Sequence, residues 1–161
     1  YFRYLMKADV ESLYALLQQV RPLHRRVARS VAAHLEGTGL GTGARAVLSV
    51  LSCEGAMSVP QIGRTLFLPR QNVQKWVDEL LARGLVERNA NPAHRRSWLI
   101  ALTVRGEELF AAIREREDGF AAALAGRLDA ADVDTARRVL SACLDHFTAF
   151  EDDPDRPRPL A

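Results

Sequence analysis

The chain of 161 residues carries 22 lysines and arginines against 20 acidic residues, a net charge of +2, and 48% of its residues are hydrophobic. This is enough apolar material for one domain with its own core, and so small a net charge identifies no class of partner. We expect neither a membrane-spanning helix nor a signal peptide, because no apolar run is long enough and no basic start precedes one. Two distant cysteines, Cys53 and Cys143, form no paired motif, which favours the reducing cytoplasm over a disulfide-stabilised fold.

The N-terminal third of the chain is predicted to be helical. Apolar residues recur at helical spacing from about residue 5 to residue 35, which indicates one long helix. Pro22 lies inside it and removes a backbone donor, so we expect a kink or break near Val20. The glycine-rich run from Gly37 to Gly43 predicts a connector, and a short helix follows that ends before Gly55.

Two further helices are predicted from their end signals. Ser58, with Gln61 three residues later and Pro60 in the first turn, is typical of a capping box, so a helix should begin there. After a short turn, Pro69 suits the first position of a second helix. Gly84 then stands where a left-handed residue ends that helix.

The second of these helices carries a polar group at its N-terminal end. In a helix-turn-helix protein this part of the second helix enters the major groove of DNA. The amides of Gln71, Asn72 and Gln74 suit paired hydrogen bonds to adenine N6 and N7. Arg70 suits either guanine or a phosphate, and Lys75 and Arg64 are predicted phosphate contacts.

The hydrophobic period changes after Gly84. Residues 85–88 and 97–102 are predicted strands, joined by a loop over residues 89–96. Arg95 and Arg96 at the tip of this hairpin suit insertion into a narrow minor groove. One of them is alternatively expected to pair with a carboxylate and hold the hairpin's shape, and we assign one arginine to each role. Helix, turn, helix and hairpin together indicate a winged helix-turn-helix.

Charge along the chain agrees with this interpretation. Residues 58–106 hold eight basic and three acidic residues, a net charge of +5, so the remainder carries −3 of the total of +2. A basic middle flanked by neutral or acidic arms indicates a local contact with a polyanion. Chance clustering on a solvated face is the alternative.

Two helices are predicted after the hairpin. Thr103 can cap a long helix to about Leu128, and Asp129 with Asp132 can open a last helix. Residues 151–161 are charged and rich in proline, which predicts a disordered tail. The fold class is therefore mainly α with a small β-hairpin wing. Trp76 and Trp98 are expected to be packing residues, although Trp76 lies close enough to the polar group to be partly exposed beside DNA.

These segments together resemble one family of regulators. Four segments and a dipeptide carry the resemblance: VPQI at 59–62, RQNVQ at 70–74, LARGLVE at 81–87, NPAHRRS at 91–97 and LT at 102–103. They are similar to the MarR family of bacterial transcription regulators, which are dimeric winged helices. His94 stands where many members have an aspartate that braces a wing arginine.

The resemblance implies different roles for different segments of the chain. Residues 1–36 and 104–150 are expected to form dimerisation helices, and residues 44–103 the DNA-binding region. The family also implies a small-molecule pocket, for which Arg45 with His24 and Arg25 would favour an anionic or aromatic effector. The alternative is that these three side chains are solvated or face phosphates. Some relatives sense oxidants through a cysteine, but a packed structural thiol is the expectation for both Cys53 and Cys143.

The expected function is a sequence-specific, ligand-responsive regulator, most simply a repressor, that binds double-stranded DNA as a homodimer on a pseudo-palindromic operator. No metal or cofactor is expected, because the four histidines are scattered and no phosphate-binding loop occurs. The absence of a paired acid, base or nucleophile motif disfavours an enzyme. A thiol-based redox sensor and a winged-helix module for protein contacts without a DNA role stay open as alternatives.

Overall fold

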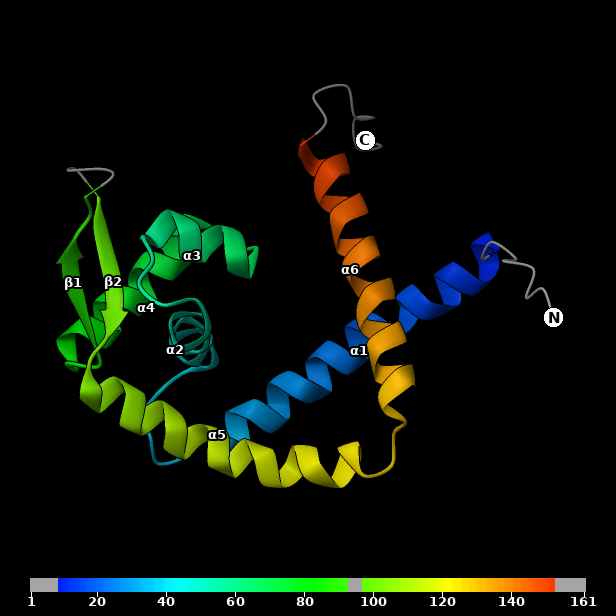
Figure 1. The fold of residues 1–161 in the computed structure, drawn as a ribbon, viewed down its shortest axis with the longest axis horizontal. Coiled ribbons are helices and arrows are strands. Elements are labelled where there is room, and N and C mark those ends of the chain that lie inside the picture. Colours follow the sequence, from blue (N-terminus) through cyan, green and yellow to red (C-terminus); the bar gives the residue numbers. More distant parts are fainter. Residues whose placement is uncertain (1–8, 93–96, 153–161) are drawn as a thin grey trace. The chain divides into compact units, whose positions relative to one another are not determined.

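The computed structural model describes residues 9–92 and 97–152, and their elements confirm a mainly helical fold with one antiparallel hairpin (Figure 1). The chain divides into one unit of residues 1–117 and another of residues 118–161. In chain order the elements are α1 (Val10–His34), α2 (Thr42–Glu54), α3 (Val59–Leu66), α4 (Arg70–Ala82), β1 (Val86–Ala90), β2 (Trp98–Leu102), α5 (Val104–Ala125) and α6 (Ala130–Asp152). None of these helices is long and apolar enough to cross a membrane.

Helix α1 begins at a cap that sequence reading missed. The carboxylate of Asp9 accepts hydrogen bonds from the backbone N–H of Ser12 at 2.7 Å and from its hydroxyl at 2.9 Å, and these bonds lower the pKa of Asp9 below its ordinary value. The helix then runs through Pro22 without interruption, so the predicted break is wrong. Because proline has no N–H, the carbonyl of Gln18, one turn earlier, loses its helical donor. Both residues are exposed, so water can satisfy that carbonyl.

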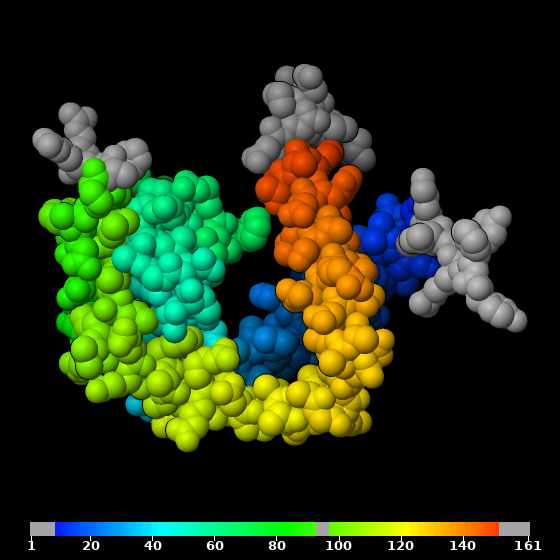
Figure 2. Space-filling model, in the orientation of Figure 1, coloured from blue at the N-terminus to red at the C-terminus, as the bar shows by residue number. Residues whose placement is uncertain are grey.

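The core lies among α2, α3, α4, the hairpin and the start of α5. Figure 2 shows the segment from α2 to the hairpin, coloured cyan to green, as one closely packed body. The largest side chains that are completely enclosed come from every one of these elements and include Leu48, Ile62, Leu80, Leu85, Ile100 and Ile113. Each such side chain contributes about 1.5–3 kcal/mol by leaving water. Helix α2 contacts α3, α4 and β2, so it is the scaffold on which the helix-turn-helix and the hairpin rest.

The turn between α3 and α4 is closed by a left-handed residue. Phe67 has φ of 53°, and its N–H donates to the Arg64 carbonyl at 3.2 Å while that of Leu68 donates to the Gly63 carbonyl at 2.9 Å. A Cβ on Gly63 would lie 3.1 Å from the Leu68 carbonyl oxygen, so a glycine allows the turn to close. Pro69 is the N-cap of α4, and the helix begins at Arg70, one residue later than predicted.

The end signals predicted for α3 and α4 are confirmed. The backbone N–H and the hydroxyl of Ser58 both donate to Gln61 Oε1, at 2.8 and 2.6 Å. Gly84 has φ of 65° and donates to the Leu81 carbonyl, while Leu85 donates to that of Leu80, both at 3.0 Å. These two bonds form a Schellman motif that stops α4 and directs the chain into the hairpin.

Both strands of the predicted hairpin are present: each begins one residue later than predicted, and β1 continues two residues further, to Ala90. The register of the hairpin pairs Val86 with Leu102 and Ala90 with Trp98. Met57 adds a third segment that sequence reading missed, because it exchanges backbone hydrogen bonds of 3.0 and 2.8 Å with Ile100. The segment before α3 and the wing are thereby joined.

The caps of α5 and α6 are also as predicted. Thr103 Oγ1 accepts the Gly106 N–H at 3.1 Å, and Asp129 Oδ1 accepts the Ala131 N–H at 2.7 Å. Helix α5 ends at Ala125, before the predicted Leu128. Helix α6 continues to Asp152, past the predicted end at 150, and the rest of the predicted tail lies outside the described residues.

Candidate nucleic-acid interface

Helix α4 presents two chemically distinct faces. Val73, Val77 and Leu80 recur at helical spacing and are buried, which fixes the rotation of the helix on the core. The predicted base-reading and phosphate-binding residues then fall on the opposite side. Arg70, Gln71, Asn72 and Lys75 are exposed, and Gln74 is half-buried. The structure thus brings the five predicted polar residues of this helix together on one accessible surface.

One carboxylate connects this surface to the wing. Asp78, one turn after Gln74, accepts a hydrogen bond from Gln74 Nε2 at its Oδ1 over 2.9 Å. Arg88 on β1 brings its Nη2 to within 3.4 Å of the same oxygen. Sequence reading missed the role of Asp78, although its spacing of four residues from Gln74 is a recognisable helical pairing. Arg88 is its partner only because the hairpin packs beside α4.

A cavity of about 400 Å³ lies between α4 and the wing. Its polar walls include Arg70, Gln74 and Arg88, and its apolar walls are Val59, Pro60, Trp98 and Ile100. A shallower hollow of about 560 Å³ lies along the polar residues of α4 and is lined by Arg70, Gln71, Gln74, Lys75 and Asp78. Both recesses therefore carry cationic and amide side chains, the groups that bind a nucleic-acid backbone and base edges, and the second also carries the acidic Asp78.

The two tryptophans have different surroundings. Trp76 is half-buried against the first turn of α2, where a Cβ on Gly43 would lie 2.1 Å from its indole ring, so the prediction of a packing residue is confirmed. For Trp98 that prediction is wrong, because 57% of the residue is exposed. It shares a strand face with the buried Ile100 but pairs with Ala90 at the loop end of the hairpin, beyond the last core side chain.

Arg64 and Arg83 of the basic segment have different surroundings. Arg64 is exposed on α3, on an accessible surface as a phosphate contact requires. Arg83, in contrast, donates to the carbonyls of Gly39 at 2.7 Å and Thr38 at 2.6 Å, so it holds the α1–α2 connector. Arg95 and Arg96, with His94, lie outside the described residues, and their predicted roles stay predictions.

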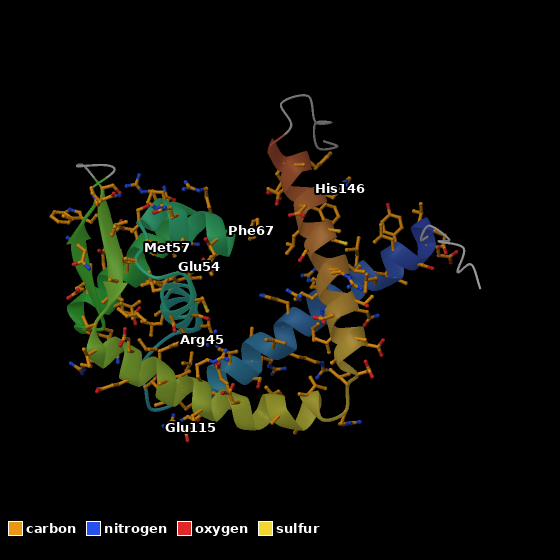
Figure 3. The ribbon with its side chains drawn as sticks, in the orientation of Figure 1. Arg45, Glu54, Met57, Phe67, Glu115 and His146 are labelled. Atoms are coloured by element: carbon orange, nitrogen blue, oxygen red, sulfur yellow. The ribbon has the colours of Figure 1, made fainter. Side chains whose placement is uncertain are left out.

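The residues predicted for a small-molecule pocket are not joined to one another. Arg45 points from α2 toward α5, where it pairs with Glu117, with Nε 2.8 Å from Oε1, and its guanidinium lies 5.9 Å from the centre of the Phe110 ring (Figure 3). His24 and Arg25 are exposed on α1, and as consecutive helical residues they point about 100° apart. Among the described residues, no hydrogen bond or ion pair joins either of them to Arg45.

The prediction of a packed thiol is wrong for Cys53. This cysteine is exposed because the buried face of α2 consists of Ala44, Val47, Leu48 and Leu51, and Cys53 falls outside that stripe. It lines a cavity of about 290 Å³ with residues of α2 and α5 that include Phe110 and Arg114. Cys143 is half-buried on α6.

Comparison with known proteins agrees with this geometry. A model of the MarR family matches residues 38–97, which span most of the connector, α2, the helix-turn-helix and β1. An uncharacterized protein of Mycobacterium tuberculosis is 37% identical over 142 residues, which cover 85% of this chain and 96% of that protein. An uncharacterized protein of Mycobacterium bovis matches equally well.

Solved structures give the same result. A crystal structure of a MarR family transcription regulator is 31% identical, covers 89% of this chain and 95% of its own, and superposes with a TM-score of 0.74. A MarR family transcriptional regulator from Silicibacter pomeroyi is 25% identical. The match covers 92% of this chain and 99% of the other, with a TM-score of 0.75.

The fold and its exposed polar helix face define the protein as a winged helix-turn-helix transcription regulator of the DNA-binding class. The chain belongs to the MarR family.

Proposed function

We propose that this regulator recognises a specific DNA sequence as a homodimer, that it acts as a repressor, and that an effector releases it. The observation that carries the proposal is the exposed face of α4, where Gln71, Asn72 and Arg70 lie at the helix N-terminus beside the wing. Gln71 and Asn72 read base edges in this proposal, and Arg64 and Lys75 hold phosphates. One of the two arginines Arg95 and Arg96 enters the minor groove from the wing tip, and the other pairs with a carboxylate that holds the wing's shape.

The exposed apolar residues of α1 support the homodimer. The helix contains no buried residue, yet Leu13, Leu16, Val20, Leu23 and Val27 are all exposed apolar side chains on one face. Exposed apolar stripes of this length mark protein interfaces. In a twofold dimer built from residues 1–36 and 104–150, two α4 helices would reach successive major grooves of a pseudo-palindromic site.

Effector response would act through the distance between those two helices. A ligand that binds one dimer geometry more tightly than the other shifts the population toward it and weakens operator binding. An anionic or aromatic effector would be held by Arg45, His24 or Arg25, and Arg45 would then have to exchange Glu117 for the ligand. Thiol chemistry is a second candidate signal, favoured by the exposure of Cys53 in a cavity that Glu107 and Arg114 also line.

The test uses the full chain and a duplex recovered by rounds of binding selection from random sequences, with a scrambled duplex as control. Asn72→Ala or Gln71→Ala should remove most of the preference between the two duplexes. Arg95→Ala should weaken binding to both alike, and wild-type binding should fall steeply with salt because several phosphates are neutralised. If no duplex is enriched and binding does not depend on salt, the protein is a winged-helix module for protein contacts.

A further inference from the structure

We propose that Asp78 is a positioning residue for sequence reading, which improves discrimination between DNA sequences at the expense of affinity. The proposal rests on the proposed function of α4 and adds a residue that carries the wrong charge for a DNA contact. Its basis is the single oxygen, Asp78 Oδ1, that holds both Gln74 of the recognition helix and Arg88 of the wing.

The first consequence concerns the orientation of the Gln74 amide. A free glutamine amide can rotate by 180° and offer either its carbonyl or its NH₂ group toward a base. In the first orientation it pairs with adenine, and in the second its N–H groups can donate to guanine N7 and O6. The bond from Nε2 to Asp78 fixes the amide, so the carbonyl and one remaining N–H are presented in a constant order. Asp78 thereby makes Gln74 selective among purines.

The second consequence concerns Arg88. Its side chain is about half exposed and lies on the wall of the cavity between α4 and the wing. A DNA phosphate that entered this cavity would be within its reach. An unrestrained arginine in this position would bind any phosphate, which adds affinity without sequence information. Pairing with Asp78 holds the guanidinium on the side of α4 and limits that contribution.

The third consequence is electrostatic. The side chain of Asp78 is 55% exposed and lines the hollow along the polar residues of α4, so its charge opposes the approach of DNA phosphates. An exposed pair with Arg88 contributes too little to stability to explain the placement of an acid here. A repulsive group that penalises imperfect partners is a recognised source of specificity.

The experiment compares Asp78→Ala with wild type in the full chain, using the selected duplex and its scrambled control over a series of salt concentrations. Loss of Asp78 should strengthen binding to the scrambled duplex several-fold and reduce the preference for the selected duplex about tenfold. The matched control is Glu87→Ala, which removes an equal charge from the neighbouring strand position without touching Gln74. It should strengthen binding to both duplexes and leave the preference intact.

Two further measurements distinguish the positioning role of Asp78 from the effect of its charge and from a loss of folding in the variant. In a Gln74→Ala background, Asp78→Ala should cause a clearly smaller loss of preference than in the wild-type background, because the residue it positions is absent and only the release of Arg88 and of the charge remains. A thermal melt verifies that the variant is folded, and Asp78→Leu, which has a similar size and no hydrogen-bond acceptor, replaces it if it is not.

The outcomes are distinct. If Asp78→Ala keeps the wild-type preference while Asn72→Ala loses it, the positioning role is overturned and the proposed function stands. The positioning role is also overturned if Asp78→Ala reduces the preference by the same factor in the Gln74→Ala background as in the wild-type background. A wild-type protein that prefers no duplex refutes the proposed function itself.

Discussion

Arg45 on α2 and Glu117 on α5 are joined at two points, with Nε donating to Oε1 at 2.8 Å and Nη2 donating to Oε2. Both side chains are largely buried, and the Phe110 ring lies below the guanidinium. The pair therefore fixes the scaffold helix of the DNA-binding region to the helix that leaves the wing. An anionic effector at Arg45 would compete with Glu117 and so act on this connection.

Breaking this pair from one side should destabilise the protein strongly. Arg45→Met leaves the Glu117 carboxylate partly buried without its partner, at an expected cost of about 3 kcal/mol in the free energy of unfolding. Urea denaturation at a fixed protein concentration measures this cost. The double variant Arg45→Met/Glu117→Leu should recover much of it, because no unpaired charge remains. If the double variant is no more stable than the single one, the loss of packing and not of charge pairing explains the effect.

The docking of α5 on the base of the wing depends on Gly106. A Cβ at this position would lie 2.0 Å from the Leu85 carbonyl oxygen, a backbone atom that cannot move aside. Gly106→Ala is therefore expected to cost at least about 3 kcal/mol, at the upper end of overpacking effects. The control is Gly119→Ala on the same helix, where a Cβ meets no atom within 4 Å and where alanine should stabilise the helix slightly. Equal melting temperatures for the two variants would contradict the close approach.

Phosphate and base contacts should separate by their dependence on salt. Lys75→Ala is expected to weaken binding to the selected and the scrambled duplex by the same factor and to reduce the slope of log affinity against log salt by about one per subunit. A titration of each duplex at several salt concentrations measures both quantities. A change in preference without a change in slope would assign Lys75 to the bases.

The features that sequence predicted well are those with local causes. The Ser58 cap, the Gly84 stop and the Thr103 cap each depend on bonds within a few residues, and all three are present. The apolar spacing of α4 likewise determined which of its residues face outward.

The features that sequence missed depend on distant contacts. Arg83 was counted among the cations of the basic segment, but it holds the carbonyls of a connector more than 40 residues earlier. The exposure of Trp98 follows from where the core ends along the hairpin, and the link between Asp78 and Arg88 depends on the packing of the wing beside α4. Periodicity carries no information about any of these three.

The exposed stripe of α1 makes the homodimer testable without DNA. Leu23→Glu places a carboxylate in that stripe, where it is harmless on an isolated chain because Leu23 is exposed. In a dimer the same carboxylate would be buried without a partner, so the dissociation constant should rise by about a hundredfold or more. Sedimentation equilibrium over a range of protein concentrations measures this rise.

The matched control lies on the same helix. Gln18 is exposed and lies roughly opposite the stripe by the 3.6-residue helical period, so Gln18→Glu adds the same charge without meeting the partner. It should leave the dimer intact, whereas Leu23→Glu should give a folded monomer with an unchanged helical circular dichroism spectrum per residue. A Leu23→Glu protein that is still dimeric at low concentration would exclude this face of α1 from the interface. Operator binding by that monomer should also fall, because a single α4 reads only one half-site.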